Sequence, residues 1–170
     1  MSNSINQRRP AFKGLRWHRE QFFSFLIPVD WLRFHWKDDR QGALYGPSPD
    51  DAHTVFAVNL TDLGFSVSTD DLDDLFDGFL TSIQQLPHVE IELSKKKVTG
   101  GLMSLEAKYT FAEDKMLRKR WVRVLYHDTH QIAFTAQGAT PDVYDYWLPM
   151  FYEAMMTAKV HSTAPSDIYS

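Results

Sequence analysis

The sequence predicts an α+β fold in which a central antiparallel sheet lies between two amphipathic helices. Its 170 residues suit a single domain. Apolar and polar residues alternate with strand periodicity through much of the second half of the chain. Two stretches with helical periodicity, one in mid-chain and one near the C-terminus, are available to cover the sheet. The expected architecture is a three-layer α/β/α sandwich with about six or seven strands in its sheet.

Three apolar stretches in the first third of the chain predict the early strands. Residues 22–27 are rich in β-forming side chains and stop at Pro28. Residues 31–36 alternate between two faces, which is a strand pattern. Residues 55–60 are nearly all apolar, which is typical of a central strand that is covered on both faces.

The mid-chain helix has the clearest signals in the sequence. Ser68 and Asp71 form a Ser-x-x-Asp variant of the capping box at its start. Aspartates in the first turn favour the positive end of the helix dipole, and Pro87 ends the helix. The apolar residues at helical spacing are Leu72, Leu75, Phe76, Phe79, Leu80 and Ile83.

Short polar turns after this helix allow a strand register to be predicted. If Asp114-Lys115 and Asp128-Thr129 are two-residue turns, the strands on either side of them pair as hairpins. Glu106 then lies opposite Arg123, and we expect these two residues to form a cross-strand pair on one face of the sheet. Residues that pair across strands share a face of the sheet. One face carries Leu105, Ala107, Tyr109, Val122 and Val124, and the other carries Trp121, Leu125, Ile132, Phe134 and Ala136.

The second helix is predicted to begin at Thr140-Pro141, where a capping residue precedes proline at the first helical position. An internal proline removes a hydrogen bond and clashes with the preceding turn. We therefore expect Pro149 to break or kink the helix, with a short helical turn as far as Trp147 and a main helix over residues 148–160. The apolar stripe of that helix comprises Met150, Phe151, Ala154, Met155 and Ala158.

The composition excludes several classes of function. The chain has no cysteine, which excludes disulfides, thiolate catalysis and Cys-ligated zinc. Its net charge of −4 argues against sequence-independent nucleic-acid binding, which needs a basic surface. The chain contains no Gly-x-Ser-x-Gly elbow, phosphate-binding glycine loop or zinc-protease motif. We therefore expect no cofactor, and nothing in the sequence supports catalysis.

Residues 1–12 and 162–170 are polar and aperiodic, which predicts disordered tails on either side of one domain at residues 13–161. The basic N-terminus is not followed by the apolar run of a signal peptide. No segment approaches the roughly 20 apolar residues of a membrane span. We therefore expect a cytoplasmic protein with no membrane span.

Three short motifs lie near the ends and starts of these elements. They are Ile27-Pro28-x-x-Trp31, Asp71-Leu72-x-x-Leu75-Phe76 and Tyr146-x-x-Pro149-x-Phe151. In this order, and over roughly residues 15–160, the sequence resembles the family that joins the photosystem subunit PsbP, the Ran-binding Mog protein and bacterial DcrB-like proteins. The resemblance implies a three-layer α/β/α sandwich that binds other proteins and does not catalyse. It assigns no functional residue to this chain.

The first candidate binding surface is the acidic face of the mid-chain helix. Asp70, Asp73, Asp74 and Asp77 share a face by their i, i+3, i+4, i+7 spacing. Such a face would dock a basic protein partner or bind a hard cation weakly, although no EF-hand spacing supports calcium. The alternative is a helix face that only contacts water.

Aromatic side chains supply the second candidate surface. The five Trp residues are expected to lie mostly in the core. An aromatic-lined groove between the sheet and a helix is the more specific hypothesis. Phe12 and Trp17 are expected to be half-exposed, and an exposed Trp near a chain end often belongs to a contact surface.

His127 and His130 flank the predicted turn at Asp128-Thr129, so their rings could approach each other. Two imidazoles with an aspartate between them are able to hold a transition metal. Ordinary surface turn residues are the alternative interpretation.

Two functions therefore stay open from the sequence. The first is a non-catalytic protein-interaction or chaperone-like domain that presents an aromatic groove or the acidic helix to a partner. The second is a small-molecule-binding protein or an unrecognised enzyme with a pocket between sheet and helix. A pocket that holds Arg33, His35 or Arg123 beside Glu106 would favour the second.

Overall fold

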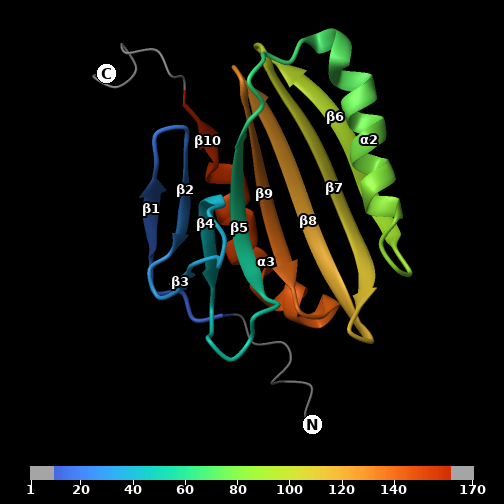
Figure 1. Ribbon diagram of the computed structural model, residues 1–170. Coiled ribbons are helices and arrows are strands. Elements are labelled where there is room, and N and C mark those ends of the chain that lie inside the picture. Colours follow the sequence, from blue (N-terminus) through green and yellow to red (C-terminus); the bar gives the residue numbers. More distant parts are fainter. Residues whose placement is uncertain (1–9, 162–170) are drawn as a thin grey trace.

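The computed structural model describes residues 10–161 as two antiparallel sheets and two helices (Figure 1). The large sheet contains β3 (Leu32–Phe34), β4 (Gln41–Gly46), β5 (Val55–Asp62), β6 (Glu90–Thr99), β7 (Leu102–Glu113), β8 (Met116–His127) and β9 (His130–Gly138). The small sheet contains β1 (Leu15–Arg19), β2 (Phe23–Pro28) and β10 (Lys159–Val160). The helical elements are the 3₁₀ turn η1 (Thr69–Asp71), α2 (Leu72–Gln84) and α3 (Pro141–Thr157).

The strand order of the large sheet is β3-β4-β5-β9-β8-β7-β6, and the small sheet has the order β1-β2-β10. The predicted α+β sandwich is therefore confirmed, with seven strands in the central sheet and one helix on each of its faces. The small sheet was not predicted. It contains β2, which lies beside α3 on one face of the large sheet (Figure 1).

The predicted register is confirmed. Glu106 lies opposite Arg123 in the β7–β8 pair, and Arg123 lies opposite Phe134 in the β8–β9 pair. The turn residues Asp114, Lys115 and Asp128 all have positive φ angles, which hairpin turns of two residues favour because their twist matches that of the strands.

Two separate cores follow from this register, because successive residues of a strand point to opposite faces. The core on the α3 side is built from aromatic rings of both sheets, including Phe25, Phe56 and Phe134. The core on the α2 side packs Leu72 and Ile83 of the helix against the sheet. Both predicted face assignments are confirmed.

Each helix covers only part of its face of the sheet. α2 contacts β6 and β7, whereas α3 contacts β8, β9 and β2. A helix is about 10–12 Å wide and strands lie about 4.8 Å apart, so one helix spans two or three of the seven strands. The prediction that residues 55–60 are covered on both faces is therefore wrong in part. Phe56 and Val58 are fully buried toward α3, but on the other face only Ala57 is buried, and Val55 and Asn59 are half-buried.

The break predicted at Pro149 is absent, and α3 is one continuous helix. Its N-terminus is capped as predicted, since the Thr140 hydroxyl accepts a hydrogen bond from the Val143 backbone N–H at 3.2 Å. Pro149 lies on the exposed side of α3. The Asp145 carbonyl, four residues earlier, is the acceptor that loses its helical partner, and on this side water can satisfy it.

The predicted end of the second helix is also wrong. α3 stops at Thr157, whose hydroxyl donates to the Glu153 carbonyl at 2.6 Å and accepts from the Leu26 N–H of β2 at 2.9 Å. Lys159 and Val160 then pair with β2 as strand β10. The Thr157 side chain thus joins the end of α3 to β2, directly before the chain pairs with β2 as β10.

Glu106 and Arg123 form the predicted cross-strand pair on one face of the sheet, but each charged group binds another partner. The Glu106 carboxylate accepts from the Trp121 indole N–H at 2.8 Å and lies 3.6 Å from the Lys95 ammonium. Arg123 instead donates to the Met155 carbonyl at 2.6 Å. This carbonyl lies in the last turn of α3, where carbonyls lack helical partners and favour a cation.

The predicted tails fall largely outside the described residues, so their disorder stays a prediction. Neither α2 nor α3, the helices of the described residues, has the length and apolar character needed to cross a bilayer.

His18 joins the small sheet to the large one. Its Nδ1 lies 2.8 Å from the Tyr45 hydroxyl on β4, and its Nε2 lies 2.9 Å from the Glu20 carboxylate. The ring stacks on Phe25 and is almost fully buried. Burial lowers the pKa of His18, and the nearby Glu20 carboxylate offsets this only in part.

Acidification should destabilise the fold through His18. Its pKa in the folded chain lies below the ordinary value of 6.5, so the unfolded chain binds the proton first. The contribution of neutral His18 to stability is therefore fully present above pH 6.5. It is lost as the pH falls from there through the lower pKa of the folded chain. The urea midpoint should therefore drop more between about pH 7.5 and pH 5.5 in the wild type than in His18→Gln, whose amide does not titrate. Equal drops would contradict this role.

Replacing Pro149 by alanine should stabilise the protein. A proline inside a helix costs about 3 kcal/mol, because a backbone hydrogen bond is missing and the ring clashes with the preceding turn. Alanine removes this cost, but it also makes the unfolded chain more flexible, which offsets part of the gain. We expect a net gain of about 1–2 kcal/mol in the free energy of unfolding, measured by urea denaturation. Pro141→Ala is the matched control, because proline at the first helical position is already favourable. A loss of stability in Pro149→Ala would contradict the prediction.

Candidate functional site

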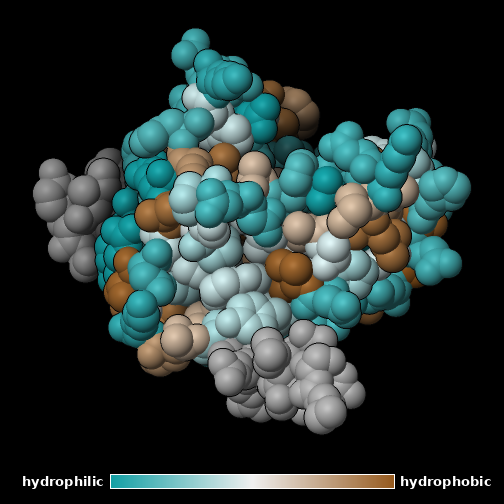
Figure 2. All heavy atoms as spheres, turned by 90° about the horizontal axis from the view of Figure 1, so that it is seen from below, coloured by the Kyte–Doolittle hydropathy of each residue, from teal (hydrophilic) through white to brown (hydrophobic). Residues whose placement is uncertain are grey.

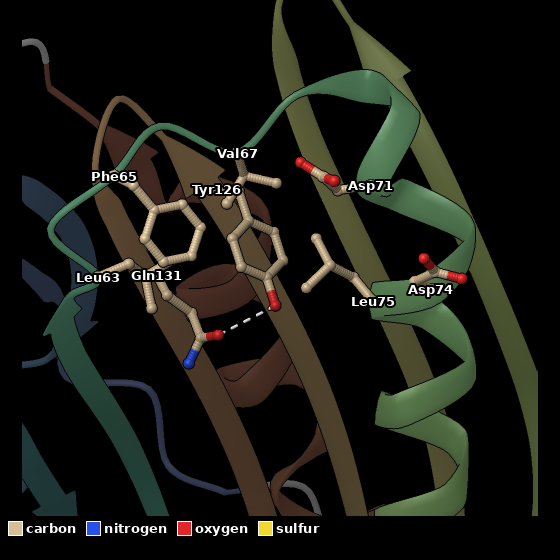
Figure 3. A pocket seen from close by; sticks show the side chains of 8 residues that line it. All are labelled: Leu63, Phe65, Val67, Asp71, Asp74, Leu75, Tyr126 and Gln131. Atoms are coloured by element: carbon tan, nitrogen blue, oxygen red, sulfur yellow. Dashed lines mark hydrogen bonds between the residues drawn. The ribbon is translucent and has the colours of Figure 1, made fainter.

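A groove lies between α2 and the part of the sheet that α2 leaves uncovered (Figure 3). Two hollows, of about 340 Å³ and about 370 Å³, share Asp74, Leu75, Tyr126 and Gln131 and so form one continuous depression. We call this depression the α2 groove. It is lined by Leu63, Phe65, Val67, Asp71, Asp74, Leu75, Gly78, Phe79, Ser82, Val124, Tyr126 and Gln131.

The floor of the α2 groove comes from β8 and β9. Tyr126 and Gln131 lie opposite each other across these strands, and the Tyr126 hydroxyl donates to the Gln131 side-chain carbonyl at 3.0 Å (Figure 3). Burial raises the pKa of Tyr126 above its ordinary value, so the phenol stays neutral at physiological pH. The floor therefore presents an aromatic surface with a neutral, hydrogen-bonded edge.

The wall opposite α2 is the segment that joins β5 to η1. Figure 3 shows Leu63 and Phe65 on one side of Tyr126, with Leu75, Asp71 and Asp74 on the other. Phe65 is 61% exposed, an unusual state for a large aromatic ring. This wall therefore offers apolar surface that the fold itself does not bury.

Hydrogen bonds at its start hold this segment in place. The Leu63 N–H donates to the Thr129 carbonyl at 2.8 Å, and the Asp62 carboxylate accepts from the Gly64 N–H at 2.9 Å. The latter bond, with further help from the Thr129 hydroxyl, lowers the pKa of Asp62. Gly64 has a φ of +77°, which glycine adopts without strain. Phe65 is thus presented from an anchored turn.

The helix wall carries two carboxylates at the groove. Asp71 accepts hydrogen bonds from the Ser68 N–H at 3.0 Å and from the Ser68 hydroxyl at 3.1 Å, so the predicted contact between the capping residues is present. Asp74 lies one turn along α2 and forms no ion pair within residues 10–161. The groove therefore has one carboxylate that serves the fold and one that is available to a ligand.

The four aspartates of the predicted acidic face lie in different surroundings. Of these, only Asp74 lines the α2 groove. Asp73 forms an ion pair with Lys96 of β6, while Asp70 and Asp77 are exposed outside the groove. Residues on one helix face spread over a wide arc. The four aspartates therefore lie at different positions relative to the sheet and have different neighbours.

The predicted aromatic candidates lie away from the α2 groove. Trp17 is 38% exposed and sits between two cations, with Arg19 at 4.8 Å and Lys159 at 5.2 Å from its ring centroid. Phe12 is 65% exposed and borders a different hollow of about 390 Å³ beside Pro149 of α3. Of the other Trp residues, Trp31 and Trp121 are buried, and Trp36 and Trp147 are half-buried.

Exposed apolar side chains do not form one large patch at the far end of the molecule. Figure 2 views the end of the sheet opposite the α2 groove, where apolar side chains gather in several small groups separated by hydrophilic ones. Scattered groups of this kind are ordinary on a protein surface.

His127 and His130 pair across the β8–β9 turn as predicted, but the structure brings no metal site to them. The His130 ring packs on the Phe22 ring, with 4.1 Å between the ring centroids, and its Nε2 lies 4.0 Å from Asp62. The His127 Nε2 lies 3.7 Å from Asp128. Within residues 10–161, no three or more His, Asp or Glu side chains converge as metal ligands would.

The α2 groove does not contain the residues that the small-molecule hypothesis named. None of Arg33, His35, Glu106 and Arg123 lines the α2 groove. Arg33 instead lies 3.6 Å from Glu20.

Sequence reasoning named Asp74 but missed the floor and the opposite wall of the groove. The predicted register already places Tyr126 opposite Gln131 on the same face as Val124. Leu63, Phe65 and Val67 alternate with Gly64 and Ser66 in a segment between a strand and a capping box, where apolar side chains need a reason. These two signals were available, but nothing local shows that α2 stops short of β8 and β9.

No family model matches this sequence, and no curated protein matches it. The fold does match solved structures. Cyanobacterial PsbP (CyanoP) from Synechocystis sp. PCC 6803 has a TM-score of 0.61 at 14% identity, over 91% of this chain and 99% of that one. LpqN, involved in cell envelope biogenesis of Mycobacterium tuberculosis, has a TM-score of 0.60 at 12% identity, over 82% of this chain and 83% of that one.

A third similar structure is PA94 from Pseudomonas aeruginosa, a protein of unknown function described as a putative regulator. Its TM-score is 0.59 at 14% identity, over 88% of this chain and 99% of that one. The three likenesses confirm the PsbP-like fold that the sequence motifs implied. At these identities they establish the fold alone.

Removing the Asp71 carboxylate should loosen the helix wall of the groove. Asp71→Ala loses both hydrogen bonds to Ser68, and capping losses of this kind cost about 1 kcal/mol. Asp70→Ala removes the same charge from the same end of the helix without those bonds. The free energy of unfolding should fall more in Asp71→Ala, with faster amide hydrogen exchange at the start of α2. Equal losses of unfolding free energy in the two variants would contradict this prediction, because they would show that only the charge matters and not the hydrogen bonds to Ser68.

Proposed function

We propose that this PsbP-like domain is a non-catalytic protein-binding domain, and that the α2 groove receives a partner segment with an apolar anchor next to a Lys or Arg. One observation carries the proposal. An apolar channel that includes the 61% exposed Phe65 runs beside Asp74, whose carboxylate forms no ion pair with any other described residue. Apolar contact with an adjacent opposite charge is a common basis of peptide recognition.

The apolar part of the groove would supply most of the binding energy. Leu63, Val67 and Leu75 are half-buried, and Phe65 is exposed. An inserted aliphatic or aromatic side chain would remove these surfaces from water, at about 25 cal/mol for each Å² of apolar area. The floor beneath them is the rigid β8–β9 pair, so the groove needs little reorganisation before it binds.

Asp74 would supply direction and selectivity. A basic side chain in the partner would approach it across the rim, where an ion pair is worth about 1 kcal/mol or less but steers association and rejects acidic segments. Asp71 adds negative charge to the same wall while it caps the helix. An acidic anchor in the partner would meet repulsion from both.

The chemistry of the groove supports binding better than catalysis. Its phenol is hydrogen-bonded to Gln131 and neutral, which leaves it neither a nucleophile nor a base at physiological pH. The resemblance to PsbP-, Mog- and DcrB-like proteins, which mostly bind other proteins, supports the same interpretation. It does not identify the partner.

A charge reversal at Asp74 tests the proposal. Peptides selected from a random display library on the wild-type protein should be enriched in Lys or Arg next to a large apolar residue. Their affinity, measured by fluorescence anisotropy, should fall about ten-fold or more in Asp74→Lys, because attraction becomes repulsion. Asp77→Lys makes the same charge change outside the groove and should have a much smaller effect.

A second variant tests the apolar surface of the groove that would receive the partner's anchor. Phe65→Ala, at an exposed position, should also weaken the selected peptides without lowering the thermal unfolding midpoint. Equal effects of Asp74→Lys and Asp77→Lys, or peptides with no basic residue, would refute the proposed groove.

A further inference from the structure

β6 forms a long unpaired edge of the large sheet. It is the last strand in the sheet order, and all of its ten residues except Ile91 are exposed. In such a strand every second residue directs its N–H and C=O away from the sheet. The other edge strands of the described residues are shorter, with three residues in β3, five in β1 and two in β10. β6 is therefore the longest open template for another strand.

Three consecutive lysines on β6 divide between the two faces of the sheet. Lys96 points to the α2 side, where it pairs with Asp73 and lies over the Phe76 ring. Lys95 and Lys97 lie opposite Glu106 and Ser104 of β7, on the other face. Lys95 is 3.6 Å from Glu106, while Lys97 forms no ion pair within the described residues.

Positive charge continues from this edge across the half of the sheet that α3 leaves uncovered. Lys108 lies on the same face of β7, over the Trp121 ring. Arg123 follows on β8 at the border with α3, where it donates to the Met155 carbonyl. Glu106 lies among these cations, and its carboxylate already accepts from the Trp121 indole. Residues 93–99 of β6 thus face solvent with an excess of cations on their α3 side, whereas Glu92, nearer the start of the strand, pairs with Lys119 at 3.0 Å.

This arrangement disfavours pairing of β6 with itself and favours an acidic strand. Two β6 edges in antiparallel contact would bring lysines close together, and like charges opposite each other are destabilising. An added strand with Asp or Glu at every second position would place its carboxylates on one face, about 6.6–6.8 Å apart, which matches Lys95 and Lys97. The register shift between Ile91 and Leu93 leaves residues 93–99 as the regular part of the template.

We propose that β6 binds an extended acidic segment of a protein partner by strand addition, with alternate Asp or Glu side chains facing Lys95 and Lys97. Backbone hydrogen bonds would supply affinity, and the lysines would select the charge of the segment. This surface is separate from the α2 groove, and the proposal does not depend on the function proposed for that groove.

The test uses the full-length, isotope-labelled protein and a synthetic peptide in which Glu alternates with Thr or Val. In amide spectra recorded with the peptide in excess, residues 93–99 should shift, and their outward N–H groups should exchange more slowly with solvent. Lys95→Glu combined with Lys97→Glu should weaken this peptide at least ten-fold. The same variant should gain affinity for a matched peptide with Lys in place of Glu, which a misfolded variant would not do.

Two further probes separate strand addition from general anion binding. A peptide N-methylated at alternate residues keeps the charge but lacks the hydrogen-bond donors of a strand, and it should bind at least ten-fold more weakly. Undiminished binding of that peptide, or absence of shifts in β6, would overturn the proposal. It would also be overturned if oligodeoxythymidylate bound as tightly as the acidic peptide and lost as much affinity in the charge-reversed variant.

Discussion

The width of the large sheet relative to a helix is the constraint on which the rest of the molecule depends. Seven strands are too wide for a single helix to cover, since a helix spans only two or three strands. α2 and α3 lie on opposite faces and over different strands (Figure 1). Each face therefore has one buried half and one open half. The α2 groove borders one open half, and the basic surface beside β6 belongs to the other.

The two-residue turns make this offset arrangement possible. The turns at Asp114-Lys115 and Asp128-Thr129 set the register of β7, β8 and β9, and the register assigns alternate residues to two cores. The same alternation places Tyr126 and Gln131 on the open half of the α2 side. Packing and the candidate site thus share one cause, and a one-residue slip would disrupt both.

Sequence patterns predicted some features of the fold and the site correctly and missed others. Sequence patterns were sufficient for α2, for its capping residues and for the β7–β9 register, because each depends on neighbours in the chain. They failed for Pro149, which a helix tolerates when the lost hydrogen bond faces water. They placed Glu106 opposite Arg123 correctly, but they did not identify Trp121 and Met155 as the partners of these two side chains. A pattern predicts where a side chain points, but only the fold supplies its partner.

The sequence by itself determined that the chain forms an antiparallel sheet with apolar residues on both faces, and that an acidic helix covers part of it. Hydrophobic periodicity and turn chemistry are local properties, so the chain alone expresses them. Only the tertiary structure decided that Asp74 lines a groove while Asp73 pairs with Lys96, and that Phe65 lies across from α2. Those relations join segments distant in the sequence, and they depend on where a helix ends over a sheet that is wider than the helix.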